Sequence, residues 1–190
     1  FVLFFSFRNE RASGNNTQML FEQNYPLFAS WNINFHLGVD GISVAMILLT
    51  SFVLIAGVLV SWNIEKMTKE FYFLLLLLAF GAYGFFISLD LFVLFFFLEI
   101  SVIPKYLLIG IWGSGKKEYS ANKLALLLMG GSALVLIGML GLYFSAGQDR
   151  SFDLLQLAQL NIPVTAQHII FPLLFVGFGV FTALFPFHTW

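Results

Sequence analysis

The sequence contains no cysteine and few charged residues. Of its 190 residues, 10% are Asp, Glu, Lys or Arg, against roughly 25% in a typical soluble domain. The absence of cysteine excludes disulfides, thiol chemistry and metal or redox centres built on CxxC pairs. The scarcity of charge leaves too little polar surface for a water-soluble globule. The net charge of −1 indicates no particular partner.

Apolar residues dominate the chain, with 59% hydrophobic residues and 25 phenylalanines. A helix needs about 20 apolar residues to cross a hydrocarbon core of about 30 Å, and the chain contains five such runs. We therefore predict an all-α, polytopic transmembrane helix bundle in a single domain. The five runs are residues 41–62, 71–89, 91–112, 121–145 and 166–187. A partial run at residues 1–7, without a starting methionine or a signal peptide, suggests an internal fragment of a longer protein.

A polar stretch, residues 8–40, separates the partial run from the first full one and is too hydrophilic to cross a membrane. Its end, INFHLGVD (residues 33–40), alternates apolar and polar residues, which indicates a short extended segment on the membrane surface. Strands are otherwise poorly supported. Asp40 lies where an N-cap belongs. Lysines gather in two short loops, which predicts that these loops are cytoplasmic. They are Lys66, Lys69, Lys116 and Lys117.

The stretch FFFLEISVIPKYLLIG (residues 95–110) places charged residues inside an apolar run. Glu99 follows Asp90 by nine residues, which is about 13 Å along a helix and close to the bilayer midplane. A charge there costs about 3 kcal/mol on insertion scales. Glu99 is either a hydrogen-bonded structural carboxyl or a functional group that takes up and releases a proton or holds a cation. Acids inside a membrane are functional by default, so we favour proton transfer. Asp90 itself is most simply an N-cap.

Lys105 lies six residues after Glu99. On an ideal helix the two are rotated by about 240° and do not share a face. The lysine stem can snorkel to the membrane surface near Trp112. Alternatively, Pro104 kinks the helix, changes the relative rotation, and brings Lys105 into a proton path.

Other polar residues in the spans carry weaker signals. Lys123, one turn inside its run, is either a topogenic anchor or the entrance of a polar channel. The triplet of residues 130–132, Gly-Gly-Ser, favours close packing of helices, and the alternative is a break in the helix that exposes carbonyls to water. His168 and His188 lie near opposite ends of the last run, where a lone histidine is usually interfacial or capping.

Four blocks in order carry a family resemblance. They are HLGVDGISVAMILLTS (36–51), LFVLFFFLEISVIPKYLLIGIWG (91–113), ANKLALLLMGGS (121–132) and FPFHTW (185–190). Together they resemble the antiporter-like subunit M (chain 4) family of proton-pumping NADH:quinone oxidoreductase, respiratory complex I. The resemblance covers most of the chain from His36 onward.

The resemblance implies a membrane subunit that moves protons while electron transfer occurs elsewhere. It assigns proton translocation to Glu99, Lys123 and His188, and implies no cofactor, metal or redox chemistry in this chain. NADH, FMN, iron–sulfur clusters and quinone are expected in other subunits. Expected partners are neighbouring membrane subunits and the lipid bilayer, not nucleic acid. The expected location is a bacterial inner (plasma) membrane.

One departure concerns the lysine that the family usually places five residues before the proline of the FPFHTW motif. Counting back from Pro186 gives Phe181, and no base lies nearby. Either another cation substitutes, with Lys105 the first candidate and Lys123 the second, or pumping is altered. Two alternative functions stay open. One is a cation/proton antiporter or membrane hydrogenase subunit of the same fold; the other is a scaffold without pumping activity.

Overall fold

The computed structural model describes residues 1–147 and 150–189, so Trp190 of the FPFHTW block lies outside the described residues. Five helical segments in this part are long and apolar enough to cross a membrane, which confirms the predicted fold class. They are α2 (Gly41–Val60), α3 (Thr68–Ile87), α4 with α5 (Leu91–Ile100, Val102–Trp112), α6 (Lys117–Ser145) and α8 (Val164–Phe181). The remaining helices are α1 (Val2–Ala12), α7 (Leu154–Leu157), η1 (Ala29–Trp31) and η2 (Phe187–Thr189).

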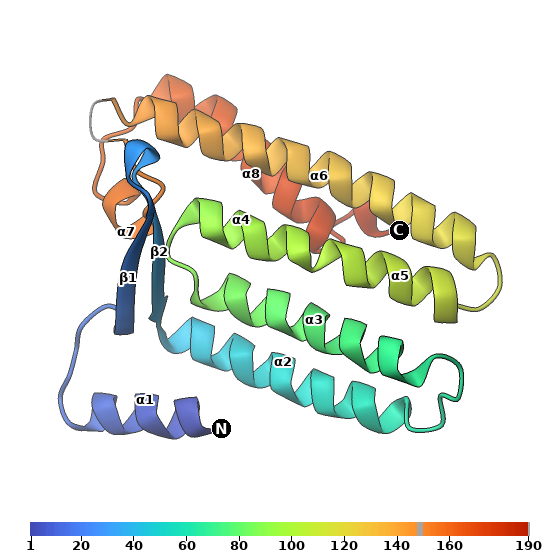
Figure 1. Ribbon diagram of the computed structural model, residues 1–190. Coiled ribbons are helices and arrows are strands. Elements are labelled where there is room, and N and C mark those ends of the chain that lie inside the picture. The colour runs from blue at the N-terminus through green and yellow to red at the C-terminus, as the bar shows by residue number, and fades with distance from the viewer. Residues whose placement is uncertain (148–149, 190) are drawn as a thin grey trace.

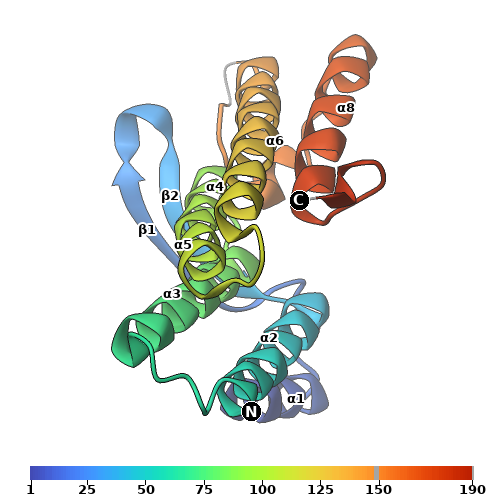
Figure 2. The same ribbon diagram turned by 90° about the vertical axis from the view of Figure 1, so that its right-hand side faces the viewer.

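The long helices lie side by side in one open row, in the order α2, α3, α4–α5, α6, α8 (Figures 1 and 2). One end of the row carries both strands and α7, and we call it the hairpin end. The opposite end carries the short loops of residues 61–67 and 113–116, and we call it the lysine end. Successive helices run in opposite directions, so Lys66 and Lys116 lie at the same end of the bundle.

A β-hairpin lies at the hairpin end and corrects the expectation of a single extended segment. β2 (Ile33–Val39) pairs antiparallel with β1 (Leu20–Phe28), which the sequence reading missed. The register shifts between Leu20 and Gln23 and again beside Pro26. These irregularities break the two-residue alternation by which a strand is recognised, because each extra residue turns the following side chains to the other face.

Several helix boundaries differ from the expected ones, and the last helix differs most. α8 ends at Phe181, six residues before the expected end at 187. Ala183 adopts a positive φ of 55°, and the amide of Leu184 donates to the carbonyl of Gly179 at 2.8 Å. The helix therefore ends with a single residue, Ala183, in the left-handed (αL) backbone conformation. Pro186 also disfavours helical backbone at the residue before it. The helix expected at 121–145 begins earlier, at Lys117.

α6 and α8 cross with their backbones in close approach. A Cβ atom added at Gly177 would lie 2.9 Å from the carbonyl oxygen of Gly131, so no larger residue fits there. Val180 of α8 also packs against Gly131. Because Gly131 lies at the middle of α6, α8 ends alongside the middle of its neighbour (Figure 1). Non-helical backbone at membrane depth is tolerated where it is buried in protein or lines a polar cavity.

Candidate functional site

The span that carries Glu99 is broken in its middle. α4 ends at Ile100 and α5 begins at Val102, with Ser101 between them. Pro104 has no amide hydrogen for the carbonyl of Ile100, and its ring presses on that turn. The amide of Ser101 is shared between the carbonyls of Phe97 and Leu98, at 3.3 and 3.2 Å. Ser101 keeps right-handed helical backbone angles (φ −74°, ψ −16°), so the break is a local tightening of the turn.

The carboxyl of Glu99 has an incomplete set of partners. Within residues 1–147 and 150–189, its Oε1 atom is buried and accepts no hydrogen bond. The Ser132 hydroxyl and the Lys105 ammonium are the groups that act on this carboxyl. The Ser132 hydroxyl lies within hydrogen-bonding reach of the Glu99 carboxyl, and it also reaches the Met129 carbonyl at 3.0 Å. Since a hydroxyl has one proton, the two acceptors compete for it.

Lys105 turns toward the middle of its span. Its Nζ atom donates to Ser101 Oγ at 3.3 Å, one turn back along the chain. Trp112, which marks the lysine end, lies seven residues in the opposite direction. The side chain therefore does not adopt the snorkelling conformation, and Glu99 and Lys105 interact electrostatically.

The other two candidates of the sequence reading do not join this pair. Lys123 is half-buried on α6, and His188 is exposed on η2, where its ring stacks on Phe185 at 5.7 Å. Phe181, at the position where the resemblance expects a lysine, packs on the same apolar cluster as Val102 of α5. The two side chains therefore border one cluster.

A second cluster of polar side chains lies at the hairpin end. The sequence does not predict that these residues meet. Nδ1 of buried His36 on β2 lies 2.6 Å from Oδ2 of Asp153, and its Nε2 lies 3.7 Å from Glu22. Asp153 caps α7 by accepting from the amides of Leu155 and Gln156. The pair connects residues 117 positions apart. No local sequence pattern reveals such a contact, although the N-cap role of Asp153 is a local signal.

Asp90 lies beside this pair and is fully buried. It caps α4 by accepting from the amides of Phe92 and Val93, and it accepts a third hydrogen bond from the amide of Asn34 on β2. The predicted N-cap is thus confirmed, as is that of Asp40, which accepts from Ser43. Burial raises the pKa of Asp90, the backbone hydrogen bonds oppose this, and nearby Asp153 adds to the rise.

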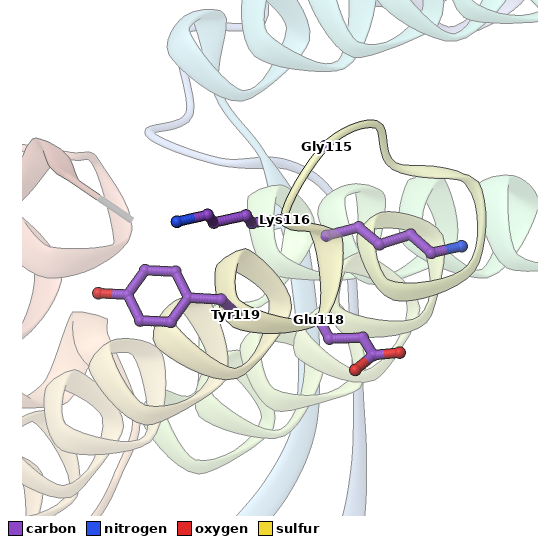
Figure 3. A pocket seen from close by; sticks show the side chains of 5 residues that line it. Gly115, Lys116, Glu118 and Tyr119 are labelled. Atoms are coloured by element: carbon purple, nitrogen blue, oxygen red, sulfur yellow. The ribbon is translucent and has the colours of Figure 1, made fainter.

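A hollow of about 590 Å³ lies at the lysine end, where α6 begins (Figure 3). Lys116 and Tyr119 extend to one side of the helix start, whereas Glu118 points to the other. Because these groups do not converge, the hollow lacks the arrangement of a binding site. Among the described residues, no cluster of three or more His, Cys, Asp or Glu side chains could hold a metal ion.

Comparison with known proteins gives consistent matches. The family described as "NADH:quinone oxidoreductase/Mrp antiporter, TM" matches residues 88–190. NAD(P)H-quinone oxidoreductase chain 4 from the chloroplast of Angiopteris evecta is 38% identical over 93% of this chain and 35% of its own length. The chain thus spans about a third of that relative.

Two solved structures share the fold. A chain of respiratory complex I from Thermus thermophilus with bound NADH matches with a TM-score of 0.83 and 24% identity, over 97% of this chain and 38% of its own. A chain of the archaeal membrane-bound sulfane sulfur reductase matches with a TM-score of 0.71 and 23% identity, over the same shares. At these identities the likeness establishes the fold alone.

Proposed function

Because the chain belongs to the NADH:quinone oxidoreductase/Mrp antiporter transmembrane family, we propose that it is part of a proton-translocating membrane subunit of an NADH:quinone oxidoreductase. In this proposal Glu99 carries the proton and Lys105 is its cationic partner. Lys123 and His188 are further members of the path, on the strength of the family resemblance.

The incompletely partnered carboxyl of Glu99 is the observation that carries the proposal. Buried polar atoms are almost always hydrogen-bonded, and an exception calls for an explanation. Glu99 lies in the middle of a span that is broken beside it, with a lysine directed toward it. A purely structural carboxyl would be saturated with donors, as Asp90 is. A carboxyl that changes its protonation state needs an environment that tolerates both forms.

The chemistry within this chain is the transfer of a proton. A proton that binds the Glu99 carboxylate gives a neutral carboxylic acid, which attracts the Lys105 ammonium less strongly. Release of the proton restores the pair. Charge movement in a neighbouring subunit can drive the cycle if it displaces Lys105, because the pair and the carboxyl proton compete. No electron enters this scheme, so NADH, FMN, iron–sulfur clusters and quinone act in other subunits.

The same proposal places the protein among other membrane subunits in an energy-transducing membrane. We propose a bacterial plasma membrane, with the loops of the lysine end on the cytoplasmic side because of their lysines. Labelling of Lys66 and Lys116 by a membrane-impermeant amine reagent in vesicles of known orientation tests the sidedness.

The decisive test is Glu99→Gln in the full-length subunit within its complex, in sealed vesicles energised with NADH. The amide keeps the shape of the side chain but cannot carry a proton at physiological pH. We expect NADH oxidation to persist in uncoupled vesicles while proton pumping falls sharply. Glu70→Gln, an exposed carboxyl at the start of α3, is the matched control and should pump normally. Full pumping by Glu99→Gln would overturn the proposal and support a scaffold.

A cation/proton antiporter subunit is the second candidate, because the matched family includes Mrp antiporters and the fold recurs in another respiratory complex. Restored sodium resistance in a sodium-sensitive host that expresses the full-length gene with its operon would favour this alternative. Co-purification with flavin and iron–sulfur proteins would favour the oxidoreductase.

A further inference from the structure

We propose that Ser101 is a positioning residue for proton transfer, because its hydroxyl holds the Lys105 ammonium toward Glu99. This inference rests on the proposed function of the Glu99 and Lys105 pair and adds a residue that acts on the lysine alone. Ser101 gave no signal in the sequence, where it is one small residue in an apolar run.

The hydrogen bonds of Ser101 form a short directed chain. Lys105 Nζ donates to Ser101 Oγ at 3.3 Å, and Ser101 Oγ donates to the carbonyl of Leu98 at 2.7 Å. A hydroxyl has one proton to donate and lone pairs that accept. Because its proton is given to Leu98, its lone pairs face the lysine. The orientation of the hydroxyl is therefore fixed by the turn, and it presents an acceptor to the ammonium.

The serine is held in place by its surroundings. Its side chain is buried, and it lies in the single-residue connection between α4 and α5. α3 packs closely on this connection: a Cβ atom added at Gly81 would lie 3.1 Å from Ser101 Cβ and 3.0 Å from the carbonyl oxygen of Phe97. The fit between α3 and the break fixes the backbone from which the hydroxyl extends.

Without the hydroxyl, the lysine has a competing conformation. A lysine stem extends along apolar surface until its ammonium reaches water, and the lysine end lies on the Trp112 side of α5. In the described residues, the only hydrogen bond of Lys105 is the one to Ser101. Loss of that bond therefore leaves the electrostatic attraction of Glu99 alone to oppose snorkelling.

The experiment compares Ser101→Ala with Ser101→Thr in the full-length subunit within its complex. A hydrogen bond to a charged group is worth about 1.5 kcal/mol, which corresponds to about a tenfold change in population. We expect Ser101→Ala to lower proton pumping by about tenfold. In the same variant, labelling of Lys105 by a membrane-impermeant amine reagent should rise by a similar factor, as measured by mass spectrometry.

Two controls separate positioning from a general effect on structure. Ser101→Thr keeps the hydroxyl and should retain both pumping and low labelling. Thr50→Val removes a hydroxyl that also donates one turn back, to the carbonyl of Met46 at 2.8 Å, but touches no lysine, so it should change neither.

The labelling distinguishes a failure of this inference from a failure of the proposed function. Unchanged labelling of Lys105 in Ser101→Ala, or equal labelling in Ser101→Ala and Ser101→Thr, would overturn the positioning role. Full pumping by Glu99→Gln would overturn the proposed function and with it this inference. Lost pumping in Glu99→Gln together with normal pumping and labelling in Ser101→Ala would overturn the inference only.

Discussion

Moving the cation from α5 to α8 tests whether Lys105 has taken over the role of the family lysine. The double variant Lys105→Met/Phe181→Lys removes the cation of this chain and places one where the resemblance expects it. Phe181 and Val102 pack on one apolar cluster, so a lysine at 181 would extend from a position that borders the same cluster as the start of α5. We expect Lys105→Met to pump poorly and the double variant to recover much of the loss.

The size of the loss follows from the separation of the charges. Among the described residues, ion pairs within 4.0 Å involve only His36, so the Lys105 ammonium and the Glu99 carboxylate are further apart than that. An effective dielectric constant of about 20 gives about 4 kcal/mol at about 4 Å, so the attraction at the larger separation is about 2 to 3 kcal/mol. Removal of this attraction corresponds to about a hundredfold change in the equilibrium between the form of Glu99 paired with Lys105 and the form that carries a proton.

The assay is the initial rate of acidification or alkalinisation of sealed vesicles per NADH oxidised. Lys105→Met/Phe181→Met is the matched control, because it makes the same change in volume at 181 without a charge, and it should pump no better than Lys105→Met. Lys69→Met, at an exposed lysine of the lysine end, should pump normally. If Lys105→Met pumps at the wild-type rate, or if a lysine at 181 gives no more recovery than methionine, the reasoning is refuted.

The remaining predictions concern stability, measured by thermal unfolding in detergent. Gly177→Ala should lower the free energy of unfolding by about 1 to 3 kcal/mol through overpacking, whereas Gly130→Ala, with no described atom within 4 Å of an added Cβ, should raise it by up to about 1 kcal/mol. Asp90→Ala should cost about 1 to 2 kcal/mol as a lost cap, whereas Asp90→Asn keeps a cap. Because the pKa of Asp90 is raised in the folded protein, its stabilising effect is present at low pH and is lost as the pH rises through that pKa. Asp90→Asn should therefore stabilise more at pH 7 than at pH 4. His36→Ala leaves Asp153 buried without its ring partner and should cost about 3 kcal/mol, seen also as faster proteolysis of the hairpin.

The spans were predictable because membrane thickness fixes their length, and local chemistry predicted the caps at Asp40 and Asp90. The hairpin was not predictable, since the bulges beside Pro26 hide the alternation of β1. The early end of α8 could have been anticipated from Pro186, which restricts the residue before it. A long apolar run concealed this signal, because hydropathy does not register backbone conformation.

The relation between Glu99 and Lys105 could be predicted only as an alternative. An ideal helix separates them by about 240°, so the sequence favoured a lysine that snorkels to the surface. The structure shows the other orientation of the side chain, because Lys105 Nζ donates to Ser101 Oγ on the side of Glu99. Pro104 removes the hydrogen bond to the carbonyl of Ile100, so the proline predicts where the span breaks. The conformation of Lys105, by contrast, is visible only in the structure.

Acidic side chains in this protein differ in how completely they are satisfied, and that difference separates stability from function. Asp90 and Asp153 each accept two or more hydrogen bonds, and both oxygens of each are used. Glu99 has one buried oxygen without a donor among the described residues, in the region where such an omission costs most. We therefore expect the two kinds of acidic side chain to respond differently when they are neutralised. Neutralising Asp90 with Asn should therefore leave pumping intact while it alters stability. Neutralising Glu99 with Gln should lower proton pumping and leave stability unchanged.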